Sequence, residues 1–143
     1  MLALRPATAQ DRAFCWDLHR QTMRGYVDAT WGWEEVDQAR RFDTSFDPAR
    51  ALIIQWHARP IGMLVVDHGA NPVKVCSLEI LPAQQNRGHG TAVLSGVIAR
   101  AGDQPVWLQV LKVNPAKAWY QRLGFVVVGQ TATHWQMLRA PSA

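Results

Sequence analysis

Hydrophobic and polar residues follow two different repeats along the chain, one typical of helices and one typical of strands. Residues 2–7 predict a short first strand. Thr8 and Asp11 then form the T-x-x-D pattern of a capping box, which predicts a helix that runs to about Gly25.

The next segment, Tyr26–Trp33, is aromatic and irregular in its spacing, and we expect no regular element there. A helical spacing returns over Glu34–Phe46, where the apolar residues are Val36, Ala39, Phe42 and Phe46. This pattern predicts a second helix.

The middle of the chain changes to runs rich in strand-forming residues, separated by Gly- and Pro-containing turns. The pattern predicts antiparallel hairpins. We expect strands over 51–57, 61–67 and 73–81, and turns over 58–60 and 68–72.

The last third begins with a polar loop over 83–90 and returns to helix and strand patterns. Asn114 and Pro115 are typical of a helix start, and Gly124 of a helix end. The elements expected after the loop are a helix over 91–101, a strand over 106–111, a helix from Pro115 to Gly124, and strands over 125–128 and 134–139.

The resulting order is β-α-α-β-β-β-α-β-α-β-β, which predicts an α/β fold with one mixed sheet flanked by helices. A chain of 143 residues with 48% hydrophobic residues is the size of one globular domain, so we expect a single domain over 1–143. We expect no signal peptide, no membrane span and no disulfide framework, which favours a cytoplasmic protein. No His, Cys, Asp or Glu set has metal-ligand spacing.

The formal charge of +4 is unevenly distributed along the chain. Residues 1–72 carry eight basic and nine acidic residues, whereas residues 73–143 carry seven basic and two acidic ones. The positive charge forms no basic run, which argues against a nucleic-acid partner. A phosphate-bearing small molecule or an ordinary basic surface would both fit this distribution.

The strongest local motif is the loop Gln85–Thr91, with the sequence QNRGHGT, between a predicted strand and a predicted helix. Gly88 and Gly90 allow a tight turn that exposes successive N–H groups at the start of a helix, which is an anion site. Arg87 adds a charge suited to phosphate. The loop fits neither a Walker motif nor the GxGxxG fingerprint.

The loop does match Q/R-x-x-G-x-G/A, the pyrophosphate motif of the GNAT superfamily of N-acetyltransferases. A second segment, Asn114–Phe125, resembles the N-x-x-A-x-x-[FY]-Y-x-x-x-G-F signature of the same family. The two motifs occur in the family's order, and the predicted elements follow the GNAT fold over nearly the whole chain. The protein therefore resembles a GNAT acetyltransferase.

The resemblance implies that acetyl-CoA is the cofactor and that it binds where two parallel strands separate. Pantetheine would pair with the backbones of Leu78, Glu79 and Ile80. For His89, packing is favoured over a phosphate contact, and for Lys117 a solvated helix face is nearly as well supported as a phosphate contact. The other cofactor-binding positions are Gln85, Asn86, Arg87, Gly88, Gly90, Thr91, Asn114 and Tyr120.

The resemblance makes Tyr120 the general acid that protonates the departing thiolate, and packing of its ring is the alternative. An oxyanion would be stabilised by the backbone N–H of Ile80. The sequence does not identify the general base. Strand alternation points Glu79 away from the face of Leu78, where the resembled family has its base. The positions on that face are Lys74 and Cys76, and neither is a carboxylate. We expect a water-mediated route, with Glu34, Glu35, His134 or a neutral incoming amine as alternatives.

The acceptor side of the resembled fold is the segment after the first helix together with the last hairpin. The residues there are Tyr26, Trp31, Trp33, Glu34, Glu35 and His134. Aromatic rings and carboxylates suit an amine, by cation–π and charge contacts. Trp31 and Trp33 fit the core beneath the sheet equally well, and His134 is more typical of a structural histidine.

These features predict an acetyl-CoA-dependent N-acetyltransferase acting on a primary amine of a small molecule or peptide. The alternative is a non-catalytic acyl-CoA-binding or regulatory module on the same fold, favoured by the missing carboxylate base. We expect no nucleic-acid or membrane partner. Members of the family often dimerise, so a homodimer is one expected state.

Overall fold

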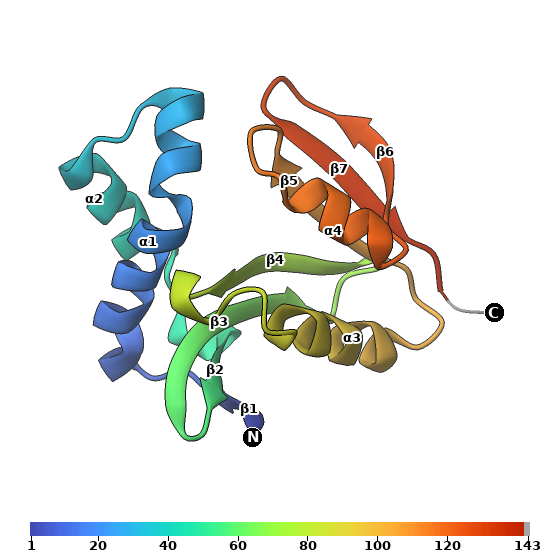
Figure 1. The fold of residues 1–143 in the computed structure, drawn as a ribbon, viewed down its shortest axis with the longest axis horizontal. Coiled ribbons are helices and arrows are strands. Elements are labelled where there is room, and N and C mark those ends of the chain that lie inside the picture. Colours follow the sequence, from blue (N-terminus) through green and yellow to red (C-terminus); the bar gives the residue numbers. More distant parts are fainter. Residues whose placement is uncertain (142–143) are drawn as a thin grey trace. The chain divides into compact units, whose positions relative to one another are not determined.

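The computed structural model describes residues 1–141 and contains the expected order of strands and helices (Figure 1). The strand order is β1-β2-β3-β4-β5-β7-β6, and β4 and β5 are parallel. This confirms the predicted α/β fold with one mixed sheet. The strands are β1 (Leu2–Pro6), β2 (Ala51–Trp56), β3 (Arg59–Asp67), β4 (Val73–Ile80), β5 (Val106–Leu111), β6 (Val126–Gln130) and β7 (His134–Arg139). The helices are α1 (Arg12–Trp31), α2 (Glu35–Ser45), α3 (His89–Ala101) and α4 (Ala116–Arg122).

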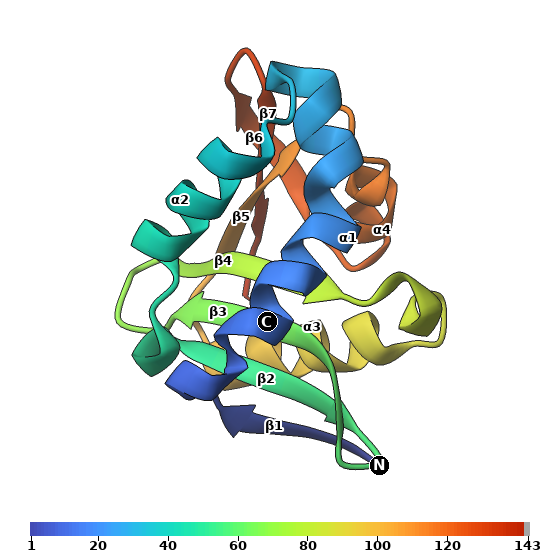
Figure 2. The same cartoon turned by 90° about the vertical axis from the view of Figure 1, so that its left-hand side faces the viewer.

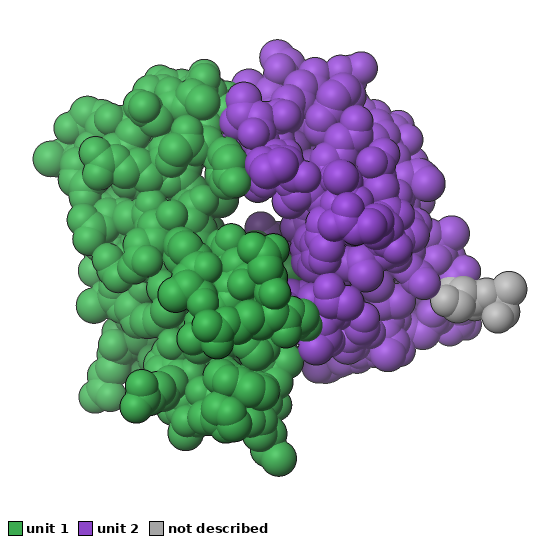
Figure 3. Space-filling view, viewed as in Figure 1, with its two compact units in different colours: residues 1–65, 77–89 green, residues 66–76, 90–143 purple. Residues whose placement is uncertain are grey.

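The chain divides into two compact units (Figure 3). Unit 1 consists of Met1–Val65 and Ser77–His89. Unit 2 consists of Val66–Cys76 and the chain from Gly90 onward. Strands β3 and β4 contribute to both, and a single domain over 1–143 stays a prediction.

In unit 1, α1 and α2 cover the same face of the antiparallel strands β1, β2 and β3 (Figure 2). Their apolar side chains make the core expected from the helical spacing. The buried cluster contains Cys15 and Leu18 of α1, Phe42 of α2, Ile53 of β2 and Met63 of β3. Burial of such side chains contributes about 1.5–3 kcal/mol each.

The first helix is longer than the sequence predicts. It does not end near Gly25 but continues to Trp31, so most of the segment expected to be irregular is helical. A glycine inside a helix costs about 1 kcal/mol but does not end it. The helix ends at Gly32, where φ is +84° and the N–H donates to the carbonyl of Asp28.

Several other boundaries shift by one or two residues. The turn expected over 58–60 is a two-residue turn at His57 and Ala58, both with positive φ, and Arg59 already pairs with Trp56. Helix α3 starts at His89, two residues before the predicted start at Thr91. Helix α4 starts at Ala116 rather than Pro115, and β6 covers 126–130 rather than 125–128.

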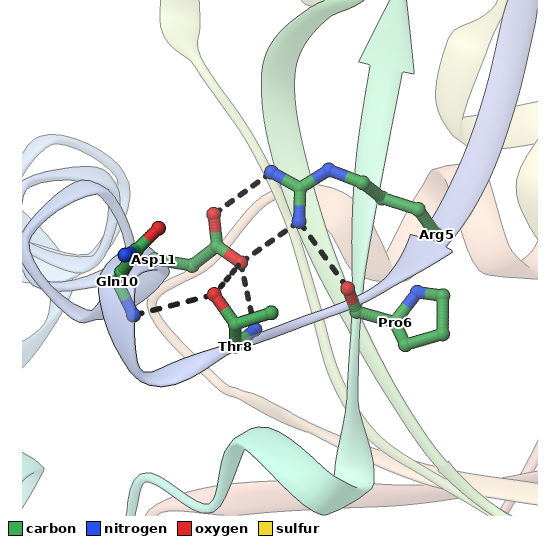
Figure 4. Close-up of polar contacts among 5 residues, drawn as sticks. All are labelled: Arg5, Pro6, Thr8, Gln10 and Asp11. Atoms are coloured by element: carbon green, nitrogen blue, oxygen red, sulfur yellow. Dashed lines mark hydrogen bonds and ion pairs between the residues drawn. The ribbon is translucent and has the colours of Figure 1, made fainter.

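The predicted capping box is present, but it caps a short 3-10 turn, Ala9–Asp11, that leads directly into α1 (Figure 4). Asp11 accepts from the Thr8 backbone N–H at 2.8 Å, and Thr8 Oγ1 accepts from the backbone N–H of Gln10 at 3.3 Å. Arg5 adds a two-pronged ion pair, with each guanidinium nitrogen 2.8 Å from an Asp11 oxygen. The Arg5 hydrogen bonds lower the pKa of Asp11 to about 2, with a smaller contribution from Thr8.

We expect Asp11→Asn to lower the free energy of unfolding by about 2 kcal/mol at pH 7. The folded-state pKa lies below the ordinary value of 3.8, so the stabilisation is present above pH 4 and is lost as the pH falls toward 2. Urea unfolding of both proteins between pH 7 and pH 2 measures this. A control is Asp103→Asn, an exposed carboxylate, which we expect to change stability by less than about 0.5 kcal/mol. A wild-type advantage that is the same at pH 2 and pH 7 would contradict the prediction.

In unit 2, β7 pairs antiparallel with both β5 and β6. Leu108, Phe125 and Met137 are almost fully buried there. Helix α4 ends in a left-handed Gly124, with φ of +95°, as predicted. The Arg139 Nε donates to the carbonyl of Leu123 at 3.0 Å, which ties the helix end to β7.

Candidate functional site

The loop after β4 turns through left-handed backbone as predicted for Gly88, whereas Gly90, the other glycine of the motif, lies inside α3 and not in the turn. Asn86 and Gly88 both have positive φ, of 62° and 85°, and α3 begins at the next residue, His89. A Cβ added to Gly88 would meet nothing within 4 Å, so the glycine is needed for its conformation rather than for space. The backbone N–H groups at this helix start can bind an anion.

The two polar side chains of the loop have different environments. Gln85 Nε2 donates to the carbonyl of Ile80 at 2.8 Å, which holds the loop against the end of β4. Arg87 is exposed and makes no ion pair or hydrogen bond with a described residue. Its guanidinium is therefore available to an anionic ligand, whereas Gln85 positions the loop.

The ring of His89 packs, as favoured by the sequence. It is 6% exposed and lies 4.8 Å from the Trp56 ring, centroid to centroid. Its Nε2 is buried without a hydrogen-bond partner among residues 1–141. A phosphate contact through the backbone N–H of His89 stays a prediction.

The strand residues expected to pair with pantetheine lie at the end of β4, in unit 1. Gly62 of β3 passes so close to this segment that a Cβ there would overlap the carbonyl oxygen of Glu79. The Glu79 side chain is 9% exposed and bonds to His19 of α1, with 3.0 Å between Oε1 and Nδ1. Pairing of Leu78, Glu79 and Ile80 with a cofactor stays a prediction.

In unit 2, Tyr120 lies on α4 between two other rings. Its centroid is 4.8 Å from that of Trp119 and 5.8 Å from that of Phe125. Burial raises the pKa of Tyr120 to about 12. The phenol is therefore protonated at neutral pH, as a general acid must be.

Two contacts hold α4 in place around Tyr120. Trp119 Nε1 donates to Thr91 Oγ1 at 3.1 Å, which links α4 to the first turn of α3. Asn114 Oδ1 accepts from the backbone N–H of Ala116 at 2.9 Å, although the N-cap position of α4 is held by Pro115 and not by Asn114 as predicted. Lys117 Nζ lies 4.2 Å from the centroid of the Trp135 ring.

The aromatic residues of the expected acceptor wall are spread over α1 and the segment that follows it. Trp31 is 60% exposed, so it does not fill the core. Trp33 is half-buried and stacks on Trp16 at 6.0 Å. Tyr26 is half-buried within α1.

Both carboxylates expected at the acceptor wall are already bound to protein groups. Glu34 caps α2, accepting from the backbone N–H groups of Val36 and Asp37. Glu35 accepts from Trp33 Nε1 at 2.6 Å and from Arg20 at 2.9 Å. These bonds, chiefly that from Trp33, lower the pKa of Glu35.

His134 begins β7 in unit 2 and has Thr133 Oγ1 2.8 Å from its Nδ1. Burial lowers its pKa, so the ring is neutral at pH 7. No set of three His, Cys, Asp or Glu residues in the described chain could hold a metal ion. Nor does any helix within residues 1–141 combine the length and apolar character needed to cross a bilayer.

Sequence reasoning missed His19, which lies on the predicted first helix. Its position three residues after Trp16 places the two on one helix face, and their rings stack at 6.2 Å. The bond to Glu79 joins residues sixty apart in the sequence, and no local pattern indicates such a pairing.

The sequence profile described as the acetyltransferase (GNAT) family matches residues 12–125. The chain belongs to the GNAT acetyltransferase family. Acetyl-CoA is the cofactor of this family, and GNAT proteins are acetyltransferases as a class. No curated protein matches the chain in sequence.

Solved structures show the same GNAT fold. An N-acetyltransferase, PaiA, from Thermoplasma acidophilum, in complex with coenzyme A, is 14% identical, with a TM-score of 0.78 and coverage of 98% of this chain and 99% of that one. An acetyltransferase from Thermus thermophilus is 25% identical, with a TM-score of 0.75 and coverage of 98% and 97%. The ribosomal-protein-S18-alanine N-acetyltransferase of Escherichia coli is 17% identical, with a TM-score of 0.69 and coverage of 100% and 96%.

The residues of this GNAT protein fit the cofactor at the places that the structure describes. The left-handed Gly88, the N–H groups at the start of α3 and the unpaired Arg87 suit a pyrophosphate. When bound, acetyl-CoA supplies an activated acyl group as a thioester.

Proposed function

We propose that this GNAT protein transfers the acetyl group of acetyl-CoA to a primary amine of a small molecule or peptide. The observation that carries the proposal is the loop before α3, where the left-handed Gly88 and the exposed Arg87 suit a pyrophosphate, in a chain that the GNAT profile matches over residues 12–125. Tyr120, on α4 within the second family motif, would be the general acid. A thiolate leaves more readily when a nearby acid protonates it. The loop from Gln85 to Thr91 would bind the pyrophosphate, and Asn114 the pantetheine arm.

The experiment has two stages. Isothermal titration with acetyl-CoA tests binding, and we expect a dissociation constant in the micromolar range. A panel of small amines and peptide N-termini is then assayed by release of free CoA thiol. Absence of binding would contradict the proposal, and binding without acetylation of any amine would favour the non-catalytic module.

We expect Arg87→Gln to weaken acetyl-CoA binding about 10-fold, because one charged contact to phosphate contributes about 1.5 kcal/mol. The loss should shrink as salt is raised from 0.05 to 0.5 M, since salt screens exposed charges. Titration at both salt concentrations measures this.

Arg59→Gln is the matched control for charge. Arg59 is also exposed and begins β3, outside the loop. Equal weakening by both substitutions would show that Arg87 acts only through the net charge of the protein.

A further inference from the structure

A buried carboxylate and a partly exposed imidazole form a pair within unit 1. Glu79 Oε1 of β4 lies 3.0 Å from His19 Nδ1 of α1. The Glu79 side chain is 9% exposed and that of His19 is 25% exposed. A carboxylate on one ring nitrogen, with the other side of the ring reaching solvent, is the arrangement of a histidine base and its orienting acid.

The hydrogen bond to Glu79 sets the tautomer of His19. Because an ionised carboxylate only accepts, the neutral ring in this contact carries its hydrogen on Nδ1 and has the lone pair on Nε2. His19 Nε2 makes no hydrogen bond with any residue in the described part of the chain. The ring therefore presents an unprotonated nitrogen that no other group in residues 1–141 uses.

Three aromatic rings hold the imidazole in this orientation. The ring centroids of Trp16, Trp33 and Phe42 lie 6.2, 6.2 and 6.0 Å from that of His19. Trp33 belongs to the expected acceptor wall. The packing thus places an oriented histidine directly beside a residue of the candidate acceptor site.

The second oxygen of Glu79 has no partner. Oε2 is buried and accepts no hydrogen bond in the described structure. A buried carboxylate with an unsatisfied oxygen is costly unless a charge or donor arrives during function. A proton gained by His19 would turn the contact between an ionised carboxylate and a neutral ring into an ion pair.

The other two candidate bases of unit 1 already accept hydrogen bonds from protein groups. Glu34 caps α2, and Glu35 is held by Trp33 and Arg20 with a lowered pKa. Unlike Glu34 and Glu35, His19 has a ring nitrogen without a hydrogen bond to residues 1–141, together with a buried carboxylate that orients the ring.

We propose that His19 accepts the proton released by the acceptor amine and that Glu79 is the positioning residue that orients it. This rests on the proposed acetyl transfer. The amine nitrogen bonds to the thioester carbon, the carbon–sulfur bond breaks, and its electron pair goes to sulfur. The nitrogen's proton passes to His19 Nε2 and then to water, and the departing thiolate takes up a proton to leave as the free thiol.

The charged and titratable groups around this pair define the pH dependence. Cys15 of α1 is a neutral thiol, because burial raises its pKa to about 11. Guanidinium groups lie over the rings that surround His19. The groups that face the cluster are Glu79 of β4, Glu35 of α2, Cys15, and Arg12, Arg20 and Arg24 over Phe42, Trp16 and Trp33 respectively.

The test compares His19→Gln and Glu79→Gln with the wild type, using the amine that reacts best in the panel. We expect His19→Gln to lower kcat about 10- to 100-fold, with less than a 2-fold change in acetyl-CoA affinity. Between pH 5 and pH 9, kcat/KM of the wild type should rise with pH, and this rise should be absent in His19→Gln. The acceptor's own titration is the same for both proteins, so the difference belongs to the enzyme. Glu79→Gln should lower kcat less than His19→Gln.

A second measurement separates catalysis from structure. In His19→Ala, added imidazole should restore at least about 10% of the lost rate if the ring acts as a base, and it would restore nothing if His19 only packs. His57→Asn is the matched control, because it removes an exposed imidazole from the same unit where φ is +51° and Asn is tolerated.

The outcomes separate the two proposals. A wild-type protein that acetylates no amine overturns both. A wild-type protein that acetylates an amine, together with a His19→Gln variant of unchanged kcat and pH profile, overturns only the role of His19. A variant whose rate is lost with its acetyl-CoA binding, and that imidazole does not rescue, also overturns it.

Discussion

Replacing Tyr120 with phenylalanine will lower kcat by about 100-fold or more, the usual contribution of a general acid. The substitution removes only the hydroxyl group. The ring keeps its contacts with Trp119 and Phe125, so we expect acetyl-CoA affinity and thermal stability to change little. Steady-state rates, titration with acetyl-CoA and thermal unfolding measure the three quantities on the same protein.

The pH dependence of the wild-type rate tests the same role. The pKa of Tyr120 is about 12, above the ordinary value of 10, so the acid form persists as the pH rises and is lost only near pH 12. We therefore expect no alkaline fall in kcat from this residue below about pH 11.

Tyr26→Phe is the comparison, since it alters the other tyrosine of the chain, on the expected acceptor wall, and should affect KM for the amine rather than kcat. An equal loss of kcat and acetyl-CoA affinity in Tyr120→Phe would deny Tyr120 the role of acid.

Replacing Gly62 with alanine will destabilise the protein by about 3 kcal/mol, at the upper end of the cost of overpacking. The new Cβ would overlap the carbonyl oxygen of Glu79 and lie 3.2 Å from both Ile54 Cδ1 and Ile80 Cγ1. The carbonyl belongs to a strand and cannot swing aside as a flexible side chain could. Urea unfolding at pH 7 measures the change.

Gly96→Ala is the matched control for the Gly62 substitution. Gly96 lies in the middle of α3, and a Cβ there would meet nothing within 4 Å. Alanine is the better helix former, so this variant should be more stable by about 0.5–1 kcal/mol. If both variants unfolded at the same urea concentration as the wild type, the close approach of β3 to Glu79 would be wrong.

Local signals in the sequence predicted local structure well. Thr8 and Asp11 predicted a capping box because its donors and acceptors lie within one turn of chain. Gly88 and Gly124 predicted left-handed backbone because few other residues adopt it without strain. The predicted helix end at Gly25 was wrong, because the conformational freedom of glycine permits a helix to end there but does not require it.

The turn at His57 and Ala58 is a second place where the local prediction was wrong. Neither residue is a typical choice for positive φ, and the sequence placed the turn one residue later, at Ala58–Pro60. Pairing of β2 with β3 sets this turn, because Trp56 and Arg59 are opposite each other in the register. Strand pairing outweighs the local preference of two residues.

The sequence by itself determined the order of elements, the family and the glycine loop, because each depends on short local patterns and on their order along the chain. Only the tertiary structure decided the hydrogen-bond partners of His19, Trp119 and Glu35. Each of those side chains is defined by a partner from another element, 3.0 Å, 3.1 Å and 2.9 Å away for His19–Glu79, Trp119–Thr91 and Arg20–Glu35. A hydrogen bond forms only when its two groups lie about 3 Å apart, so the partner of each side chain depends on which elements pack together. Packing of the core determines which elements meet, and local sequence patterns do not.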